Sequence, residues 1–405
     1  MNKKRLSEML YSDVFLPEET LAIRAQARAF ADRVLQPIAH EVNTTVEDPK
    51  NFRRDIVNAL AEAGLYQVSF SKDVGGRGLN YPMLATLTVM EELGYYTPGI
   101  ASALFDGQAI LCGQTLDKAQ DEIRSRWLPK LIRGEIVCCF ATSEPEASTD
   151  LSVSAMATMA IRDGDGYRVT GKKRWITNSV AGDIMLTLVR TGDNLTMLLI
   201  DMHSEGVTVG APDKKMGNHA QMTADVTLND VWVPRSHVIG SVGGGLRAAL
   251  AALTMGRAGI AALGVGMAQR AFDHSVEYIS GRHCFGQPIA GFQHWQFKYA
   301  DRATAIENAR NLYIKAALNA DKKCSPQPLM AMAKIVGSEV AVDMSRDAIQ
   351  ACGGYGFVRR LEGAGQDWPL ESIYRDAKIG EIYEGANEVQ RWAIAREIFG
   401  RDITG

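Results

Sequence analysis

Apolar and small residues recur at helical spacing in the N-terminal part of the 405-residue chain. In the stretch ETLAIRAQARAFADRVLQPIA they occupy Leu21, Ala25, Ala29, Val34 and Ile38, and this periodicity predicts an amphipathic helix. Similar patterning extends to about residue 137. Its main interruption is KDVGGRGLNYP, where three glycines and a proline predict a loop. Residues 1–137 are therefore expected to form a helical domain.

From about residue 138 to 240 the apolar positions alternate with polar ones, which predicts β-strands. The segments with this pattern are GDGYRVTGKKRWIT, DIMLTLVR, NLTMLLID, GVTVG and TADVTLNDVWVP. The glycine run SVGGG, residues 241–245, then predicts a domain hinge. A β-domain is expected over residues 138–245.

Helical spacing returns after this hinge. It begins with GLRAALAALTMGRAG and continues at roughly 292–321, 326–352 and 386–399. A C-terminal helical bundle is therefore expected over residues 246–405. The chain as a whole is predicted to have an α+β fold, with an N-terminal helical domain, a middle β-domain and a C-terminal helical bundle.

Charge and composition narrow the class of protein. Lys and Arg number 44 and Asp and Glu 47, a net charge of −3 that gives no electrostatic case for nucleic acid or a membrane surface. The N-terminal stretch MNKKRLSEMLYSDVF lacks a following apolar run, so no secretory signal is expected, and no membrane span is expected elsewhere. Six cysteines without a CxxC pair indicate a reducing cytoplasm, and seven scattered histidines predict no metal site.

Common cofactor and hydrolase fingerprints are missing from the sequence, which has no GxGxxG between a strand and a helix, no GxxxxGK[ST] and no GxSxG. Attention falls instead on Glu384, in the stretch IYEGANEVQR just before a predicted helix. One interpretation is an acid that stabilises the helix N-terminus through the macrodipole. The other is a general base whose pKa is adjusted by apolar surroundings.

Five segments, taken in order, resemble the acyl-CoA dehydrogenase family. They are FATSEPEASTDLS at 140–152, KKRWITNS at 172–179, RHCFGQPIAGFQ at 282–293, QACGGYGF at 350–357 and YRDAKIGEIYEGANEVQR at 374–391. The resemblance implies FAD-dependent α,β-dehydrogenation of an acyl-CoA thioester. In that reaction Glu384 removes the α-proton, hydride passes from Cβ to flavin N5, and electrons leave to an electron-transfer flavoprotein. It also implies that the backbone N–H of Glu384 binds the thioester carbonyl.

The resemblance further implies which residues contact FAD. They are Phe140, Thr142, Ser143, Thr149, Trp175, Ile176, Thr177, Phe292, Ala386, Asn387 and Glu388, together with Arg282, Phe285, Gln293, Gln350, Gly353 and Gly354, which reach the cofactor of a neighbouring copy. Such sharing implies a homotetramer. Each group also has a structural interpretation: a core Trp beside a strand Thr, a Ser/Thr-rich turn, a solvated helix Arg and a helix C-cap.

For the substrate, the resemblance points to Thr149, Arg257, Tyr383, Gly385 and Asp106. Asp106, in ASALFDGQAIL, is expected either to limit the depth of the acyl pocket or meet a polar tail, or to be a capped structural acid. The glutaryl-CoA type carries an Arg in this segment, whereas residues 99–112 contain none, which disfavours glutaryl chemistry.

Departures from the family pattern are Ala386, Asn387 and Glu388 after YEG, and Glu146 and Ser148 where glycines are frequent. LEGAGQD, 361–367, resembles an insertion, interpreted as a neutral surface loop in preference to a substrate lid. Two alternatives stay open for the function: an acyl-CoA oxidase using O₂, disfavoured because such oxidases are usually longer chains, and a non-catalytic subunit that binds CoA or flavin.

Overall fold

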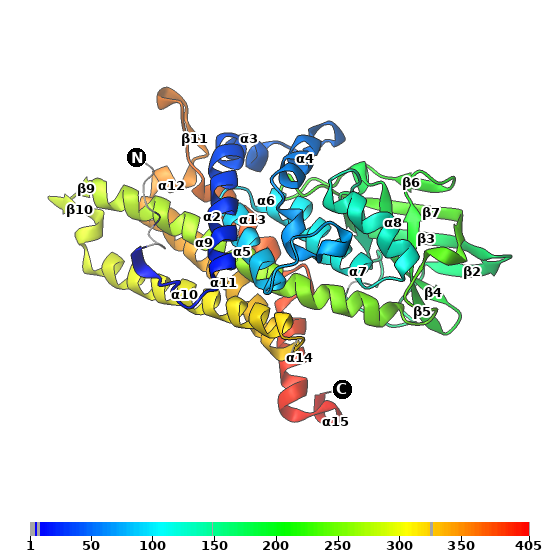
Figure 1. The fold of residues 1–405 in the computed structure, drawn as a ribbon. Helices are drawn as coiled ribbons and strands as arrows, with labels where there is room; N and C mark the ends of the chain where they lie inside the picture. The colour runs from blue at the N-terminus through cyan, green and yellow to red at the C-terminus, as the bar shows by residue number, and fades with distance from the viewer. Residues whose placement is uncertain (1–4, 6–8, 148, 325–326, 405) are drawn as a thin grey trace.

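The computed structural model describes residues 5, 9–147, 149–324 and 327–404; Ser148 lies outside them. A β-domain lies at one end of a larger helical body (Figure 1). Helices precede and follow the strands along the chain, so the predicted α+β order is confirmed. The proposed domain borders, at 137/138 and 245/246, stay a prediction.

The helices before the β-domain include π- and 3-10 segments, labelled η. They are α2 (Glu18–Phe30), η1 (Ala31–Leu35), η2 (Gln36–Ile38), α3 (Ala39–Thr44), η3 (Pro49–Asn51), α4 (Arg54–Glu62), η4 (Tyr66–Ser69), η5 (Lys72–Val74), α5 (Pro82–Gly94), α6 (Pro98–Ile100), η6 (Ala101–Cys112), α7 (Gly113–Asp117) and α8 (Asp121–Ile132). The predicted loop at 72–82 contains η5 and the turn that leads into α5.

The C-terminal region is built on long helices with short elements between them. The elements are α9 (Gly245–Gly281), β9 (His283–Cys284), β10 (Gln287–Pro288), η9 (Ile289–Gly291), α10 (Gln293–Asp321), α11 (Gln327–Cys352), α12 (Gly354–Phe357), β11 (Arg360–Leu361), η10 (Glu362–Ala364), β12 (Gln366–Asp367), α13 (Leu370–Ala377), η11 (Lys378–Glu381), α14 (Asn387–Phe399) and α15 (Arg401–Thr404). Four of these helices match the predicted ones. The segment 361–367 lies at the surface, as expected, where it forms part of the exposed β11–β12 hairpin with Arg360 paired to Asp367.

Helices α5, α9, α10 and α11 share one apolar core that joins the N- and C-terminal regions. At the crossing of α9 and α11, a Cβ on Gly264 would lie 2.1 Å from the carbonyl oxygen of Gly337, so only glycine permits this approach. By length and composition α9 alone among the described helices could cross a membrane, but 78% of its most apolar window is buried in the protein. That burial is typical of the central helix of a bundle.

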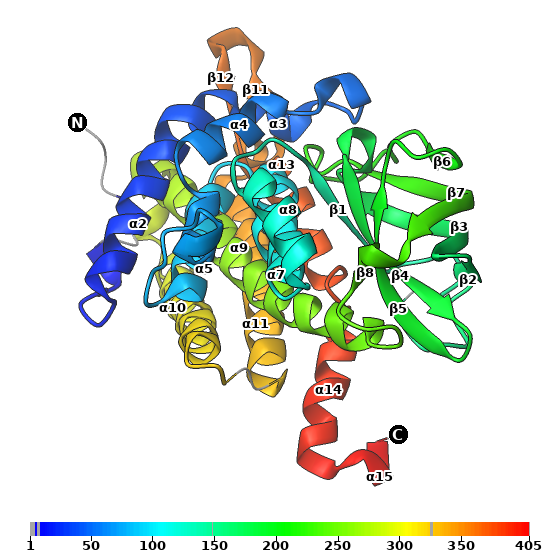
Figure 2. The same ribbon diagram turned by 45° about the vertical axis from the view of Figure 1, so that its right-hand side comes forward.

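The strands of the β-domain form one sheet in the order β6-β7-β3-β2-β4-β5-β8, with β1 pairing parallel to β4. They span β1 (Cys138–Ala141), β2 (Met159–Asp163), β3 (Gly166–Thr177), β4 (Ile184–Thr191), β5 (Asn194–Asp201), β6 (Val207–Val209), β7 (Thr223–Pro234) and β8 (Val238–Ile239). The five strands predicted from alternation are present. One apolar cluster packs one face of the sheet against α7 and α8, and a second fills the other face (Figure 2).

A β-bulge interrupts the pairing of β3 with β7 between Lys173 and Ile176. Within it Trp175 has a φ of 62°, and its side chain is 53% exposed. Bulges bend a strand and re-aim its side chains. This bulge therefore presents the indole of Trp175 outside the sheet, where the guanidinium of Arg174 lies 3.9 Å from the ring centroid.

A buried ion pair fixes the segment after β1 against β3. The Nζ atom of Lys173 lies 2.7 Å from Oε1 of Glu144, and both side chains are almost fully buried. Glu144 also accepts hydrogen bonds from the backbone N–H groups of Ala157 (2.6 Å) and Thr158 (3.0 Å). Three segments of the sequence thus meet at one carboxylate.

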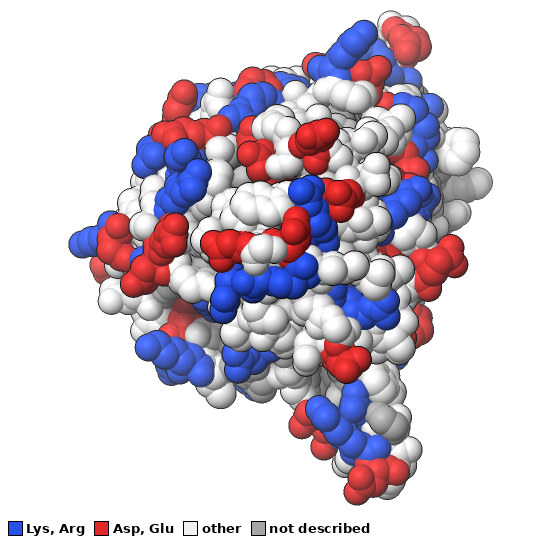
Figure 3. Space-filling view, turned by 90° about the vertical axis from the view of Figure 1, so that its right-hand side faces the viewer, with Lys and Arg blue, Asp and Glu red and all other residues white. Residues whose placement is uncertain are grey.

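The β11–β12 hairpin projects from one side of the helical body, and α14 with α15 project from the opposite side (Figures 1 and 2). Basic and acidic side chains are intermixed over the face that Figure 3 shows. On the projecting C-terminal helices, apolar side chains are exposed at Trp392, Ile398, Phe399 and Ile403.

We predict that Lys173→Met destabilises the protein by about 3–5 kcal/mol, because it leaves the Glu144 carboxylate buried without its cation. The neighbouring residue provides a matched control, since Lys172 pairs with Asp225 at 2.7 Å but is 49% exposed. Lys172→Met should cost about 0–1 kcal/mol. Chemical denaturation followed by circular dichroism measures both, and equal shifts of the two midpoints would contradict the prediction.

Candidate active site

Helix η6 lies between α5, α9 and β1, and its residues Ala101 to Ile110 are all buried. It is a π-helix, a wide form that is rare and often marks functional sites. The side chain of Gln108 accepts from the backbone N–H of Cys138 (2.9 Å) and donates to the Cys138 carbonyl (2.8 Å). These two bonds fix the start of β1 on η6.

The end of β3 is bonded to the same helix. Asn178, which follows Thr177, has a φ of 67° and donates from Nδ2 to the carbonyl of Ala103 at 2.8 Å. Asp106 lies one turn further along η6. The strand that carries Trp175 and Thr177 therefore ends beside the helix that carries Asp106.

Glu384 lies in the short connection between η11 and α14, with a φ of 55°. A left-handed backbone is unfavourable for a residue with a Cβ. Its carboxylate oxygen Oε2 is buried and has no hydrogen-bond partner among the described residues. A Cβ added to Gly256 would lie 2.5 Å from that oxygen, so the carboxylate packs directly on the backbone of α9.

Two opposite effects act on the pKa of Glu384. Burial raises the pKa of Glu384 to about 7, and the positive charges of Arg257 and Lys334 act in the other direction. A carboxyl group with a pKa near 7 is suited to accepting and returning a proton at neutral pH. The alternative interpretation, an acid that only stabilises a helix N-terminus, does not account for this burial.

Asp106 lies next to Glu384. Its side chain is 3% exposed, and Oδ1 is buried without a hydrogen-bond partner in the described part of the chain. A Cβ on Gly259 would lie 2.5 Å from Oδ1. Gly256 and Gly259 are three residues apart on α9 and so occupy one face of that helix. Burial and the charge of Glu384 raise the pKa of Asp106 well above its usual range.

Tyr383 completes this group of polar side chains. Its hydroxyl is buried and has no hydrogen-bond partner within the residues described. Burial, with the negative charges of Asp106 and Glu384 beside it, raises the pKa of the Tyr383 hydroxyl far above its usual range. Gly385, which follows the carboxylate, has a φ of 86° and gives the connection its turn into α14.

Two cations act on Glu384. Arg257, on α9, donates from Nη1 to Oε1 of Gln327 at 2.8 Å, and burial lowers its pKa. Lys334, on α11, is fully buried and donates from Nζ to Oδ1 of Asn387 at 2.8 Å. Burial lowers the pKa of Lys334 to about 8. Sequence reasoning missed Lys334, although a lysine inside the apolar run MAMAKIVG was a usable signal.

The residues after YEG lead into α14, and their side chains point to different surroundings: Asn387 into the protein and Glu388 to the surface. The amide of Asn387 is buried and is bonded to Lys334 and to Ser338 Oγ (3.1 Å). Any contact of Asn387 with a cofactor is therefore through its backbone. Glu388 is exposed, and Ala386 precedes the helix as its N-cap.

The residues expected on the flavin side lie at the ends of β1 and β3. Phe140 belongs to β1, Thr142 is buried just after it, and the carbonyl of Ser143 accepts from the backbone N–H of Arg174 at 3.0 Å. The β1–β3 association thus brings these predicted residues beside Trp175.

Three further predicted residues, Thr177, Ile176 and Thr149, differ in the groups that they could present to a ligand. The hydroxyl of Thr177 accepts from Nε2 of Gln221 at 3.2 Å. Ile176 is buried in the sheet core, so only its backbone is available, and Thr149 is exposed.

These groups fit a planar ring system with polar edges, as in a flavin. Trp175 is an exposed aromatic wall, and Thr177 carries a hydroxyl at the end of the same strand. Thr223, opposite Thr177 in the sheet, has a buried hydroxyl without a partner among the described residues. An unpaired buried hydroxyl is costly unless a ligand satisfies it.

The remaining predicted cofactor residues lie at the opposite end of α9. Arg282 follows the last residue of the helix, and its guanidinium lies 5.9 Å from the ring centroid of Tyr355, next to Gly353 and Gly354. Phe285 is 95% exposed and meets Phe292 edge-on at 6.4 Å. Gln293 and Gln350 are also exposed. The structure therefore assembles this second group of predicted residues at one surface.

The two groups are far apart within one chain. A helix rises about 1.5 Å per residue, so Arg282 lies about 39 Å from Gly256 along α9. Figure 1 shows the β9–β10 hairpin and the β-domain at opposite ends of the molecule. One chain cannot bring both groups to a single cofactor.

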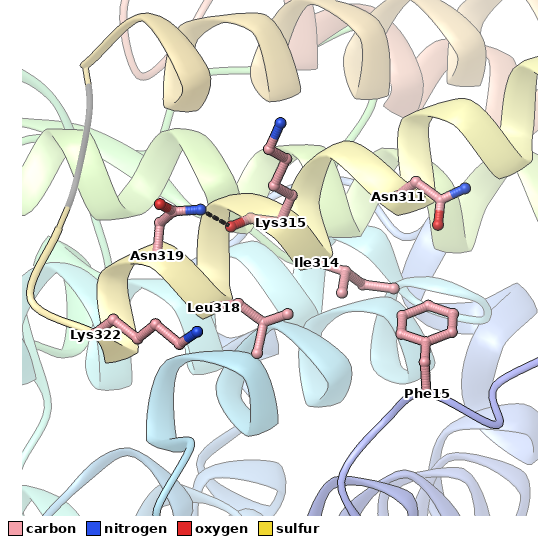
Figure 4. Close-up of a pocket in the computed structure, with 7 residues that line it drawn as sticks. All are labelled: Phe15, Asn311, Ile314, Lys315, Leu318, Asn319 and Lys322. Carbon is pink, nitrogen blue, oxygen red and sulfur yellow. Dashed lines mark hydrogen bonds between the residues drawn. The ribbon is translucent and has the colours of Figure 1, made fainter.

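A surface depression of about 300 Å³ lies elsewhere, on α10 (Figure 4). It is lined by Phe15, Asn311, Ile314, Lys315, Leu318, Asn319 and Lys322. None of the predicted site residues lines it.

Comparison with known proteins identifies consecutive domains of one family. The chain matches the acyl-CoA dehydrogenase N-terminal domain over residues 17–135, the middle domain over 139–231 and the C-terminal domain over 243–399. Together these matches cover most of the sequence.

Similar proteins agree with this result. A 3-(aryl)acrylate reductase of Clostridium sporogenes is 35% identical over 391 residues, 95% of this chain and 100% of the relative. The mitochondrial short-chain specific acyl-CoA dehydrogenase of Rattus norvegicus is 34% identical, covering 95% of this chain and 91% of the relative. The structure of butyryl-CoA dehydrogenase from Megasphaera elsdenii has a TM-score of 0.89 at 31% identity, covering 96% of this chain and all of that one. The resemblance seen in the sequence is confirmed, and this chain belongs to the acyl-CoA dehydrogenase family of oxidoreductases.

Proposed function

We propose that the protein catalyses the FAD-dependent α,β-dehydrogenation of an acyl-CoA thioester, with Glu384 as the base that removes the α-proton. The observation that carries this proposal is the buried Glu384 carboxylate, whose Oε2 has no partner in the described part of the chain and whose pKa is raised to about 7. A carboxyl group with this pKa is partly ionised at neutral pH. Because its Oε2 is shielded from water, the carboxylate can accept a proton from carbon directly.

The surrounding residues support the proton transfer. Arg257 and Lys334 stabilise the ionised carboxylate, while burial prevents it from becoming too weak a base. The proton moves from Cα of the thioester to Oε2 of Glu384. The family resemblance assigns the backbone N–H of Glu384 to the thioester carbonyl, where a donor stabilises the negative charge that develops as the proton leaves.

Phe140, Thr142, Ser143, Trp175 and Thr177 would hold the flavin ring of FAD, and Arg282 of a second copy would bind its pyrophosphate through charge-assisted hydrogen bonds. When bound, FAD supplies the acceptor for the hydride that leaves Cβ. The separation of the two groups along α9 supports completion of each site by a neighbouring copy. We propose a homotetramer, with the exposed Phe285 covered in the assembly.

The proposed electron acceptor is an electron-transfer flavoprotein, and the proposed location is the cytoplasm. A second candidate function is the reverse reaction, because the relative from C. sporogenes is named an acrylate reductase. The oxidase alternative also stays open. Oxygen consumption during acyl-CoA turnover, compared with the turnover of artificial electron acceptors, separates an oxidase from a dehydrogenase.

Glu384→Gln keeps the shape of the side chain but removes the base. We expect FAD to remain bound while the anaerobic reduction of the flavin by acyl-CoA slows by about 10²–10⁴-fold. Stopped-flow absorbance of the flavin measures the rate, and Glu397→Gln, an exposed change on α14, serves as the control. Near-parental reduction in Glu384→Gln would show that the base lies elsewhere.

The pH dependence of flavin reduction should report the ionisation of Glu384. Because the carboxylate is the active form, the rate should rise with pH through about 7 and level off above it. Lys334→Met removes a positive charge that favours the carboxylate, so the midpoint should move to higher pH. Lys322→Met, at the exposed end of α10, should leave it in place. Identical midpoints in the two variants would argue against the assignment of Lys334.

Arg282→Ala should lower FAD content and weaken the oligomer together, since bound cofactor stabilises the assembled state. Arg247→Ala, an exposed change near the other end of α9, is the matched control. Gel filtration and the ratio of flavin to protein absorbance are measured side by side. Full FAD content in Arg282→Ala would refute a shared site.

A further inference from the structure

We propose that Asp106 determines substrate specificity by binding a hydroxyl group carried near the end of a short acyl chain. The inference rests on the proposed function, because only that function places an acyl chain beside Glu384. It assigns the substrate to the class of hydroxyl-bearing short acyl-CoA thioesters and excludes plain alkyl and carboxylate-ended chains as preferred substrates.

The first observation is that Asp106 lacks a partner where a protein interior normally supplies one. Its side chain is 3% exposed, yet Oδ1 makes no hydrogen bond to any described residue. Buried polar groups are almost always paired, and an unpaired one costs about 1–3 kcal/mol. Glu91 and Glu92, two further acids buried in this helical core, are both bonded, Glu91 to Gln269 at 2.9 Å and Glu92 to Arg28 at 3.0 Å. Asp106 therefore has the environment of a group that a ligand completes.

The second observation is its position relative to the base. The carboxylate of Glu384 packs on Gly256, and that of Asp106 packs on Gly259, each at 2.5 Å from the position of an added Cβ. Cβ positions three residues apart on a helix are separated by about 5–6 Å. At about 1.5 Å per carbon–carbon bond, this spacing corresponds to roughly four bonds of an acyl chain. A group near Asp106 thus lies roughly four bonds beyond the carbon that Glu384 deprotonates.

The third observation concerns the chemistry of two adjacent buried carboxyl groups. Both cannot be ionised at once without a large repulsion, and Glu384 must be ionised to act as the base. Asp106 is then the neutral member, held protonated by burial and by the charge of Glu384. A neutral carboxyl group both donates and accepts one hydrogen bond, which matches a hydroxyl group. The unpartnered hydroxyl of Tyr383 offers a further bond.

Other chain ends fit this surface less well. An alkyl end would leave Oδ1 of Asp106 unpaired, and a carboxylate end would add a second negative charge beside Glu384. Side-chain carbons of Ile110 and Leu111 also face the two glycines, at 3.1 Å from the added Cβ positions. These apolar walls suit the methylene groups between the thioester and the hydroxyl.

The test compares two thioesters of equal length that differ only at the end, 5-hydroxypentanoyl-CoA and hexanoyl-CoA. We expect the parent enzyme to favour the hydroxyl compound by at least about tenfold in kcat/KM, because hydrogen-bonding sites discriminate more strongly than apolar ones. Asp106→Leu should reverse the preference. Asp106→Asn, which keeps a donor and an acceptor, should retain it, as should Asp193→Asn in the exposed β4–β5 turn.

The outcomes separate this inference from the proposed function. If both thioesters reduce the flavin and the parent favours hexanoyl-CoA, or Asp106→Leu has the parental ratio, Asp106 is structural and the inference is wrong although the function stands. If no acyl-CoA reduces the flavin, the function and the inference fall together. Should Asp106→Leu not fold, the ratios of the parent and Asp106→Asn decide.

Discussion

The arrangement of the candidate site depends on hydrogen bonds made to the buried π-helix η6. Its Gln108 side chain fixes β1, and its Ala103 carbonyl accepts from the residue that ends β3. The hydroxyl of Tyr66 donates to the Leu104 carbonyl on the same helix at 2.5 Å. A wide helix with no exposed face from residue 101 to 110 cannot shift without breaking these bonds in the interior. The sheet and Asp106 therefore keep their relative positions.

Charge balance then determines what this arrangement can do. In a buried region each ionised group must be compensated, and the site contains two carboxyl groups and two cations in close proximity. The two cations act mainly on Glu384. Arg257 and Lys334 both favour its ionised form and lower its pKa, whereas burial and repulsion from Glu384 raise the pKa of Asp106. The same surroundings thus raise the pKa of both carboxyl groups, and cations oppose that rise only at Glu384.

The spacing of apolar residues predicted the fold well because it depends directly on which side chains are buried. Alternation identified β3 to β7, and helical spacing identified α9, α10, α11 and α14. The short strands β1 and β2 were not predicted, since CCFA is an unbroken apolar run and MAIRD buries only one side chain. The π-geometry of η6 had no signal in its apolar sequence.

Prediction of the candidate site depended on a different signal. Glu384 was proposed from the family motif, and its packing against Gly256 could not be foreseen from either segment alone. Lys334 and Asn387 are 53 residues apart along the chain and meet only through the packing of α14 on α11. Contacts of this kind depend on tertiary structure and leave no local pattern.

The left-handed backbone of Glu384 has an evolutionary consequence. A glycine adopts a φ of 55° without the steric penalty of about 1–2 kcal/mol that an L-residue with a side chain incurs. Folding alone would thus favour glycine at this position, where the carboxylate is also costly to bury. If Glu384 is the catalytic base, as proposed, selection for turnover opposes that drift. A lineage that no longer needed the reaction would gain stability by losing the carboxylate, so the residue at this position would distinguish working descendants of this fold from stable but inactive ones.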